Sequence, residues 1–222
     1  MNYFAHFYLD SLPGQPYYNL GLILPDLMGV YDRKWKVKER TGFSIASETA
    51  LSLLNGVNRH EEVDQVFHES DFFKGYKNAI WERLKNTGFT NPPYRLFYLS
   101  HILVELLLDR ILIRNFPRQG ELMFEEMNSI NDKHLRDFFS QTGTPEKNSF
   151  WSFFSTFREK QYIFEYVKDE SFVYVLNMVN KRVGHPLFDD KKKNDLLAAV
   201  QDIEKSLIGN YSKLFREIQA VS

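Results

Sequence analysis

Residues 94–115 constrain the fold most, because apolar side chains occupy nearly every helical face of this segment. Asn91-Pro92-Pro93 precedes it and Pro117 follows it, and both signals are typical of helix ends. Its most apolar part, residues 96–108, is interrupted by Ser100, His101 and Glu105 and is shorter than the roughly 18 uncharged apolar residues of a membrane span. The segment therefore predicts a helix that is buried on most sides within a helical protein, and no membrane partner.

Apolar residues at three- and four-residue intervals continue through most of the chain after residue 44, and no stretch alternates as a strand would. The first thirty residues are rich in proline and glycine, which predicts short turns and helical pieces there. We expect an all-α fold, one domain over 1–222, built as a single compact bundle of about seven to nine helices. The expected long helices cover 44–68, 72–85, 94–115, 120–142, 149–166, 170–182 and 191–220.

Charge and cysteine content exclude several classes of protein. Lys plus Arg is 28 and Asp plus Glu is 29, so the net charge of −1 argues against a dedicated nucleic-acid binder. The absence of cysteine excludes disulfides and thiolate-ligated zinc, and fits a reducing compartment. The N-terminus has no cationic segment before an apolar run, so we expect a cytoplasmic protein. The oligomeric state stays open.

Polar residues form a row on the segment that should be buried. His101, Glu105 and Asp109 follow one another at intervals of four residues, which places them along one side of a helix. An ionisable group buried without a partner costs roughly several kcal/mol. This row is therefore expected to face a cation, a counter-charge or a wet cleft.

A second row with the same spacing, His60, Asp64 and His68, lies on the preceding long helix. Two helices that each carry imidazole and carboxylate groups can together supply four or more ligands to one ion, as helix bundles do. Nitrogen and oxygen donors without thiolates suit Mn, Fe, Mg or Zn in hydrolytic roles. Either row alone is equally compatible with intrahelical hydrogen bonds or a solvated face, so a purely structural role remains open.

Cationic residues outside these rows suggest two further contacts. Near the end of the helix expected over 170–182, Arg182 and His185 are candidates for binding phosphate, although cations are favoured at helix C-termini in any case. A basic loop is a candidate docking surface for an acidic partner, or simply a solvated loop. Its cations are Arg33, Lys34, Lys36, Lys38 and Arg40.

Several short segments of the chain, taken in order, resemble the motifs of one known family. The start, MNYFAH, is similar to MNFLAH, and residues 21–26, GLILPD, are similar to GNLLAD, two motifs of the bacterial acyl carrier protein phosphodiesterases. Residues 56–64 resemble that family's HRRID element, and residues 105–109 resemble its DxxxDH helix. The spacing of 172–182 and 211–218 resembles its closing helices, so the likeness spans most of the chain in short pieces.

The resemblance implies an all-α fold related to the HD-type metal phosphohydrolases. It also implies hydrolysis of the phosphodiester that links 4′-phosphopantetheine to holo-acyl carrier protein, with a divalent metal, for which we expect Mn or Fe before Mg or Zn. Asp64, Glu105 or Asp109 would orient the attacking water, and Arg110 or Arg182 would balance charge on the phosphate. The implied metal or catalytic positions are His6, Asp26, His60, Asp64 and Asp109, with Glu105 where the family has Asp, and our ligand set adds His68 and His101. Another phosphoester substrate and a non-enzymatic helical binding protein remain alternatives.

Overall fold

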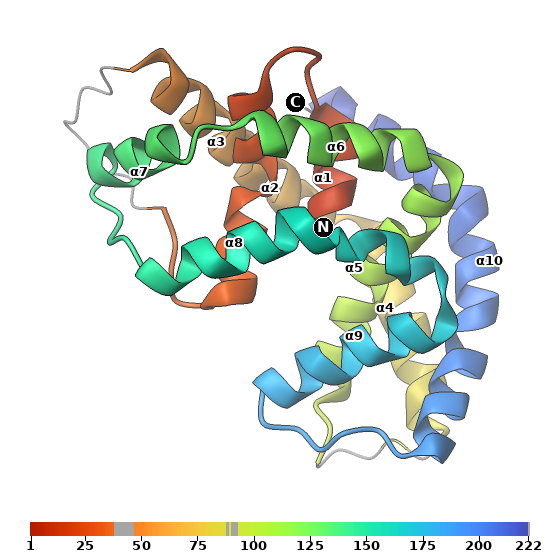
Figure 1. Cartoon of the computed structure of the whole chain (residues 1–222). Coiled ribbons are helices and arrows are strands. Elements are labelled where there is room, and N and C mark those ends of the chain that lie inside the picture. The colour runs from red at the N-terminus through yellow and green to blue at the C-terminus, as the bar shows by residue number, and fades with distance from the viewer. Residues whose placement is uncertain (38–46, 88, 90–92, 222) are drawn as a thin grey trace. The chain divides into compact units, whose positions relative to one another are not determined.

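The structure is a computed structural model that describes residues 1–37, 47–87, 89 and 93–221. Within these residues the chain forms ten α-helices and one 3-10 helix and contains no strand, which confirms the all-α class (Figure 1). The number of helices exceeds the seven to nine expected. The elements are α1 Tyr3–Asp10, α2 Pro16–Tyr31, α3 Glu48–Glu69, α4 Asp71–Lys85, α5 Leu96–Asn115, α6 Pro117–Ser129, α7 Asp132–Gln141, α8 Asn148–Lys160, η1 Tyr162–Val167, α9 Asp169–Arg182 and α10 Asp190–Val221.

Helices with strong apolar periodicity lie where the sequence predicted them. The expected helices 72–85, 94–115, 170–182 and 191–220 correspond to α4, α5, α9 and α10 within two residues at each end. The start expected at Ser44 lies outside the described residues. At the beginning of α3 the Ser47 hydroxyl accepts a hydrogen bond from the backbone N–H of Ala50 at 3.4 Å, in the manner of a helix cap.

Two expected helices are shorter than predicted, for local reasons. The segment 120–142 is divided at Ile130 and Asn131, because the Asn131 side chain accepts a hydrogen bond from the Lys133 N–H at 3.0 Å and starts a new helix. The segment 149–166 ends as an α-helix at Lys160, where Gln161 adopts a left-handed conformation with φ 49°. The 3-10 helix η1 follows directly.

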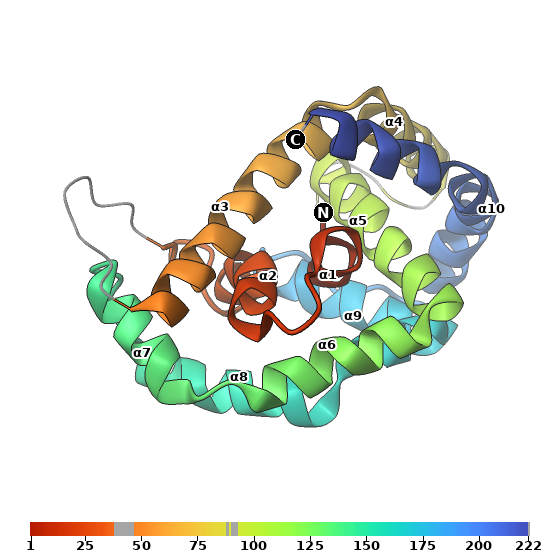
Figure 2. The same ribbon diagram turned by 90° about the horizontal axis from the view of Figure 1, so that it is seen from above.

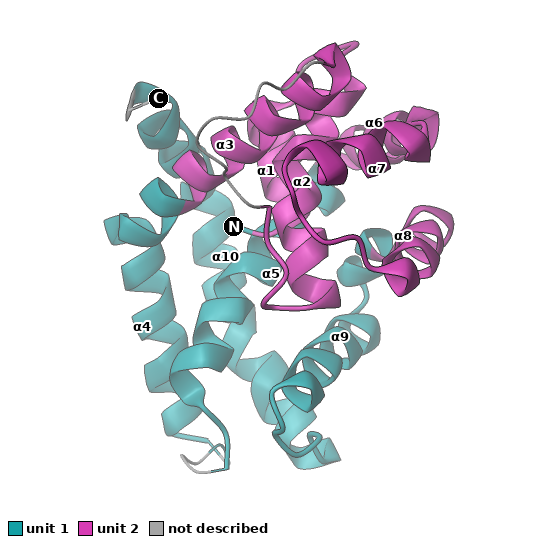
Figure 3. Cartoon of the chain, turned by 90° about the vertical axis from the view of Figure 1, so that its left-hand side faces the viewer, with its two compact units in different colours: residues 1, 65–115, 163–222 teal, residues 2–64, 116–162 magenta. Residues whose placement is uncertain are grey.

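The described contacts divide the chain into two compact units (Figure 3). The expectation of one domain over 1–222 stays a prediction. Unit 2, residues 2–64 and 116–162, contains α1, α2, the first part of α3, and α6 to α8. In it α1 packs against α2, α6 packs against both, and α8 packs against α2 and α6 (Figure 2). Trp35 is buried in this unit against the rings of Phe139 and Phe150.

Unit 1, residue 1 with 65–115 and 163–222, is built around α5. The helix α5 packs against α4 and α10, and α9 packs against α10. Most of the α5 residues are buried, including the charged Asp109 and Arg110, as the apolar sequence on nearly all faces predicted. Among the described residues no helix combines the length and apolarity required to cross a bilayer.

Candidate metal centre

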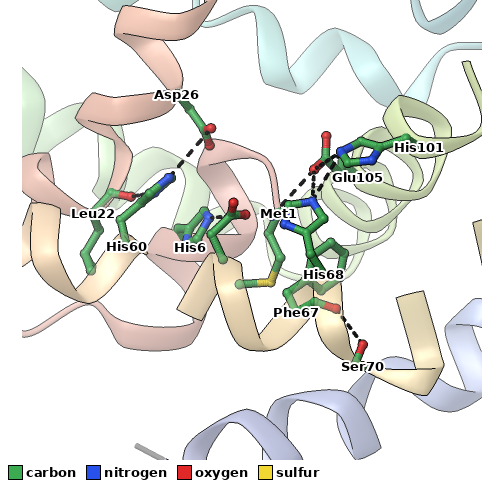
Figure 4. A network of polar contacts seen from close by, with 11 residues as sticks. Met1, His6, Leu22, Asp26, His60, Phe67, His68, Ser70, His101 and Glu105 are labelled. Carbon is green, nitrogen blue, oxygen red and sulfur yellow. Dashed lines mark hydrogen bonds and ion pairs between the residues drawn. The ribbon is translucent and has the colours of Figure 1, made fainter. Parts of the chain in front are cut away.

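Three predicted ligands converge inside unit 2. His6 of α1, Asp26 of α2 and His60 of α3 each offer one ligand atom, and these atoms lie within 4.8 Å of one another (Figure 4). A fourth predicted ligand, Asp64, lies one turn after His60, with its Oδ1 3.7 Å from His6 Nε2. Three helices distant in sequence thus contribute imidazole and carboxylate groups to one small region.

His60 is held with its second ring nitrogen directed toward the carboxylate of Asp26. Its Nδ1 lies 2.8 Å from the backbone carbonyl oxygen of Leu22, so Nδ1 carries the proton and donates it. The other nitrogen, Nε2, lies 3.9 Å from Asp26 Oδ1. A backbone carbonyl that fixes the tautomer in this way is the usual partner of a metal-binding histidine.

His6 is a buried imidazole whose outer nitrogen makes no hydrogen bond. Its side chain is 1% exposed, and its ring stacks on that of His60 with the centroids 3.9 Å apart. Nε2 lacks a hydrogen-bond partner, since the 3.7 Å to Asp64 is too long for one. Burial and the neighbouring His60 lower the pKa of His6 well below its ordinary value, so the ring is neutral at pH 7.

This donor set fits a divalent cation. Bonds of about 2.1–2.2 Å to an octahedral ion place neighbouring ligand atoms roughly 3 Å apart and opposite ones roughly 4.3 Å apart. The separations of 3.7 Å from His6 to Asp64 and 3.9 Å from His60 to Asp26 fall within that range, and exceed hydrogen-bond lengths. Two imidazoles with two carboxylates are donors that Mn or Fe accepts.

A second group of the same residue types lies in unit 1. His68 Nε2 lies 3.2 Å from His101 Nε2 and 3.1 Å from Glu105 Oε1, and His101 Nε2 lies 3.3 Å from the same Oε1. Burial would raise the pKa of Glu105, but the Met1 ammonium 3.7 Å away and the two imidazoles outweigh it and hold that pKa far below its ordinary value. Glu105 is therefore an ionised carboxylate. The ammonium of Met1 is a neighbour that the sequence pattern did not suggest.

The ligands expected around one ion thus converge in two groups. Residues eight apart on an α-helix are separated by about 12 Å along the axis and rotated by about 80°, whereas residues four apart are separated by only about 6 Å. A row of three is therefore too long for one ion. On α5, Glu105 joins His101 in the second group, whereas Asp109 belongs to neither group found among the described residues. In the same way His60 and His68 belong to different groups.

Asp109 and Arg110 occupy the buried part of α5. The Arg110 guanidinium donates a hydrogen bond to Asp169, has its Nε 3.3 Å from Glu204 Oε1, and lies over the ring of Phe172. Two carboxylates thus already balance the charge of Arg110. Its expected role toward a phosphate stays a prediction.

The predicted phosphate-binding residues and the basic loop belong to neither of the groups that the described residues form. Arg182 is exposed at the end of α9, whereas His185 is buried and its Nδ1 lies 3.2 Å from Asn180 Oδ1. Within the basic loop, Arg33, Lys34 and Lys36 are exposed. Lys38 and Arg40 lie outside the described residues.

Comparison of the chain with family models, with curated proteins and with solved structures found no match. The functional interpretation therefore depends on the chemistry of the two groups. Periodicity indicated the pairs His60 with Asp64 and His101 with Glu105, but His6 and Asp26 are single polar residues on apolar helices, and only the family resemblance pointed to them.

Proposed function

We propose that His6, Asp26, His60 and Asp64 bind one divalent cation, Mn or Fe before Mg or Zn, and that the chain uses it to hydrolyse a phosphoester. The observation that carries the proposal is the buried Nε2 of His6, which has no hydrogen-bond partner and faces the Asp64 carboxylate. Burying such an atom costs free energy unless something binds to it. A cation held between imidazole and carboxylate would remove that cost.

The four side chains would have different tasks. A bound divalent ion supplies a Lewis acid that neutralises phosphate oxygens and lowers the pKa of water. His60, oriented by the Leu22 carbonyl, and the buried His6 would act as fixed nitrogen ligands with Asp26 beside them. The side chain of Asp64, about a third exposed, is the most accessible of the set and would accept a hydrogen bond from an attacking water.

The substrate we favour is the phosphodiester of holo-acyl carrier protein, which releases 4′-phosphopantetheine on hydrolysis. Its support is the family resemblance in residues 1–6, 21–26 and 56–64. An acidic carrier would be attracted by exposed cations, and Arg33, Lys34 and Lys36 provide three of them. A different phosphoester is the second candidate, since the proposed ligand set is not specific to one phosphate ester.

Metal binding is tested first, by calorimetric titration of metal-free protein with Mn²⁺. Asp64→Ala is expected to weaken binding without unfolding the chain, because its side chain is partly exposed. His60→Ala should lose the metal as well, but it also removes the bond to Leu22, so circular dichroism must show that it folds. His134→Gln is the matched control, a histidine that contacts Tyr17 and belongs to neither group. Equal Mn²⁺ affinity in wild type and Asp64→Ala would refute the site.

Activity is tested by incubating the protein with holo-acyl carrier protein and Mn²⁺ and weighing the carrier by mass spectrometry. Loss of the phosphopantetheine mass, abolished in Asp64→Ala, is expected. An unchanged mass at high enzyme loading rejects this substrate, and a screen of aryl phosphate mono- and diesters with several metals then tests the second candidate. A wild type that neither binds nor is stabilised by Mn, Fe or Zn would favour a non-enzymatic helical protein.

A further inference from the structure

His68, His101 and Glu105 form a nearly equilateral triangle of potential ligand atoms in unit 1 (Figure 4). The three edges, between two Nε2 atoms and Oε1, measure 3.2, 3.1 and 3.3 Å. A tetrahedral ion with bonds of about 2.0–2.1 Å places its ligand atoms about 3.3–3.4 Å apart. The triangle thus has the size of one face of a tetrahedral zinc site, and it is tighter than the group in unit 2.

Hydrogen bonds alone leave one edge of this triangle unfavourable. An ionised carboxylate oxygen only accepts, and a neutral imidazole carries one proton. If each imidazole carries its proton on Nε2, the two N–H groups point toward each other across the 3.2 Å edge and repel. If one Nε2 is unprotonated, its electron pair faces that of Glu105 Oε1 across about 3 Å. A cation above the triangle would attract an electron pair from each of the three atoms, and this attraction would outweigh the repulsion along that edge.

The two imidazoles are also held in place by aromatic packing. Their rings stack with centroids 4.8 Å apart and an interplanar angle of 22°. The ring of Phe73 meets both edge-on, at 4.7 Å from His68 and 4.9 Å from His101. An apolar wall of this kind fixes ligand orientation, as the outer shell of metal sites does. The two histidine side chains are nevertheless 27% and 31% exposed, so an ion has access.

We propose that His68, His101 and Glu105 bind Zn²⁺ in tetrahedral geometry, with a water molecule in the fourth position. Two histidines and one glutamate with an open position is a donor set that catalytic zinc sites use. The ion takes over the neutralisation of Glu105 that the Met1 ammonium provides at 3.7 Å. This site is independent of the proposed phosphoesterase centre, since it shares no ligand with it.

The test is titration of metal-free protein with Zn²⁺ against a chromophoric chelator, in wild type and in single variants. His101→Gln and Glu105→Gln should each lower the zinc affinity on the order of 100-fold or more, since even outer-shell partners change metal affinity 10–100-fold. Asp26→Asn should leave this binding event unchanged, and so should His134→Gln, which serves as the matched control. Thermal unfolding of each variant checks that it folds, and Glu105→Gln keeps the size of the side chain.

Cobalt(II) substitution reports the coordination geometry of the ion bound in unit 1. Asp64→Ala, in which the ligand set of unit 2 is incomplete, should give the intense visible absorption of a four-coordinate ion when it is loaded with one equivalent of Co²⁺. The double variant Asp64→Ala with Glu105→Gln should lose that absorption. The proposal is overturned if no zinc binds to the wild type, if His101→Gln and Glu105→Gln bind zinc as the wild type does, or if the cobalt spectrum is that of a six-coordinate ion. Any of these outcomes leaves the Mn²⁺ proposal for unit 2 standing, because that proposal is tested with Asp64→Ala.

Discussion

Substitution of Gly56 by alanine is expected to separate α2 from α3 and to disturb the ligands of unit 2. The two helices cross where Gly21 meets Gly56, and a Cβ on Gly56 would lie 2.1 Å from the carbonyl oxygen of Tyr18 and 2.8 Å from the Cα of Gly21. A Cβ on Gly21 would lie 2.3 Å from the carbonyl oxygen of Leu53. These obstacles are backbone atoms, so no side chain can rotate away and the helices themselves must move apart.

The expected magnitude follows from these distances. Relief of the 2.1 Å contact to an acceptable separation requires a shift of about 1 Å at the crossing. Overpacking of this kind costs about 1–3 kcal/mol, and alanine recovers up to about 1 kcal/mol through its helix propensity. The same shift stretches the 2.8 Å bond from His60 to the Leu22 carbonyl beyond hydrogen-bond length, which removes about 1 kcal/mol more. We expect a net loss of about 2 kcal/mol in the free energy of unfolding, or a fall in Tm of about 4–8 °C.

The assay is urea and thermal unfolding followed by circular dichroism, with Mn²⁺ titration of the same samples. Gly29→Ala is the matched control, because Gly29 lies in the same helix α2 and a Cβ there meets nothing within 4 Å. That control should be neutral or more stable by up to about 1 kcal/mol. If Gly56→Ala is as stable as Gly29→Ala, or binds Mn²⁺ with wild-type affinity, the close crossing does not hold the ligands in place.

Two further changes test the polar interior. Burial and the charge of Arg95 lower the pKa of His185, so the unfolded chain takes up a proton that the folded chain does not, and stability should fall as the pH drops below about 6.5. His185→Gln should reduce the pH dependence of Tm between about pH 7 and 5, and an unchanged slope would contradict this assignment. Asn19→Ala should cost about 2–3 kcal/mol in urea unfolding, because the buried amide bonds both backbone groups of Leu12 at 2.8 Å and the Glu126 carboxylate at 2.6 Å. A loss below about 1 kcal/mol would mean that water replaces the amide.

The local pattern of the sequence determined most of the helices. The apolar periodicity of 94–115 and 191–220 is continuous, and α5 and α10 cover these segments nearly end to end. The division at Asn131 was missed because 120–142 contains no proline or internal glycine to mark it, and a cap residue in mid-pattern is a weak signal beside continuous periodicity. Helix propensity alone makes glycine at position 56 unfavourable within a helix, whereas the structure uses the missing side chain for the approach of α2.

For the candidate ligands, too, the sequence predicted one part of the arrangement and the tertiary structure decided the other. The spacing of four residues placed His60 with Asp64 and His101 with Glu105, because side chains one turn apart share a face in any helix. Which residues of other helices come to meet those pairs depends on how the helices pack, and packing brought His6 and Asp26 to His60 within unit 2 and His68 to His101 within unit 1. The sequence alone therefore determined the helices and the chemical types of the ligands. Only the tertiary structure decided that they form two groups, because the packing of the helices selects which residues meet each pair.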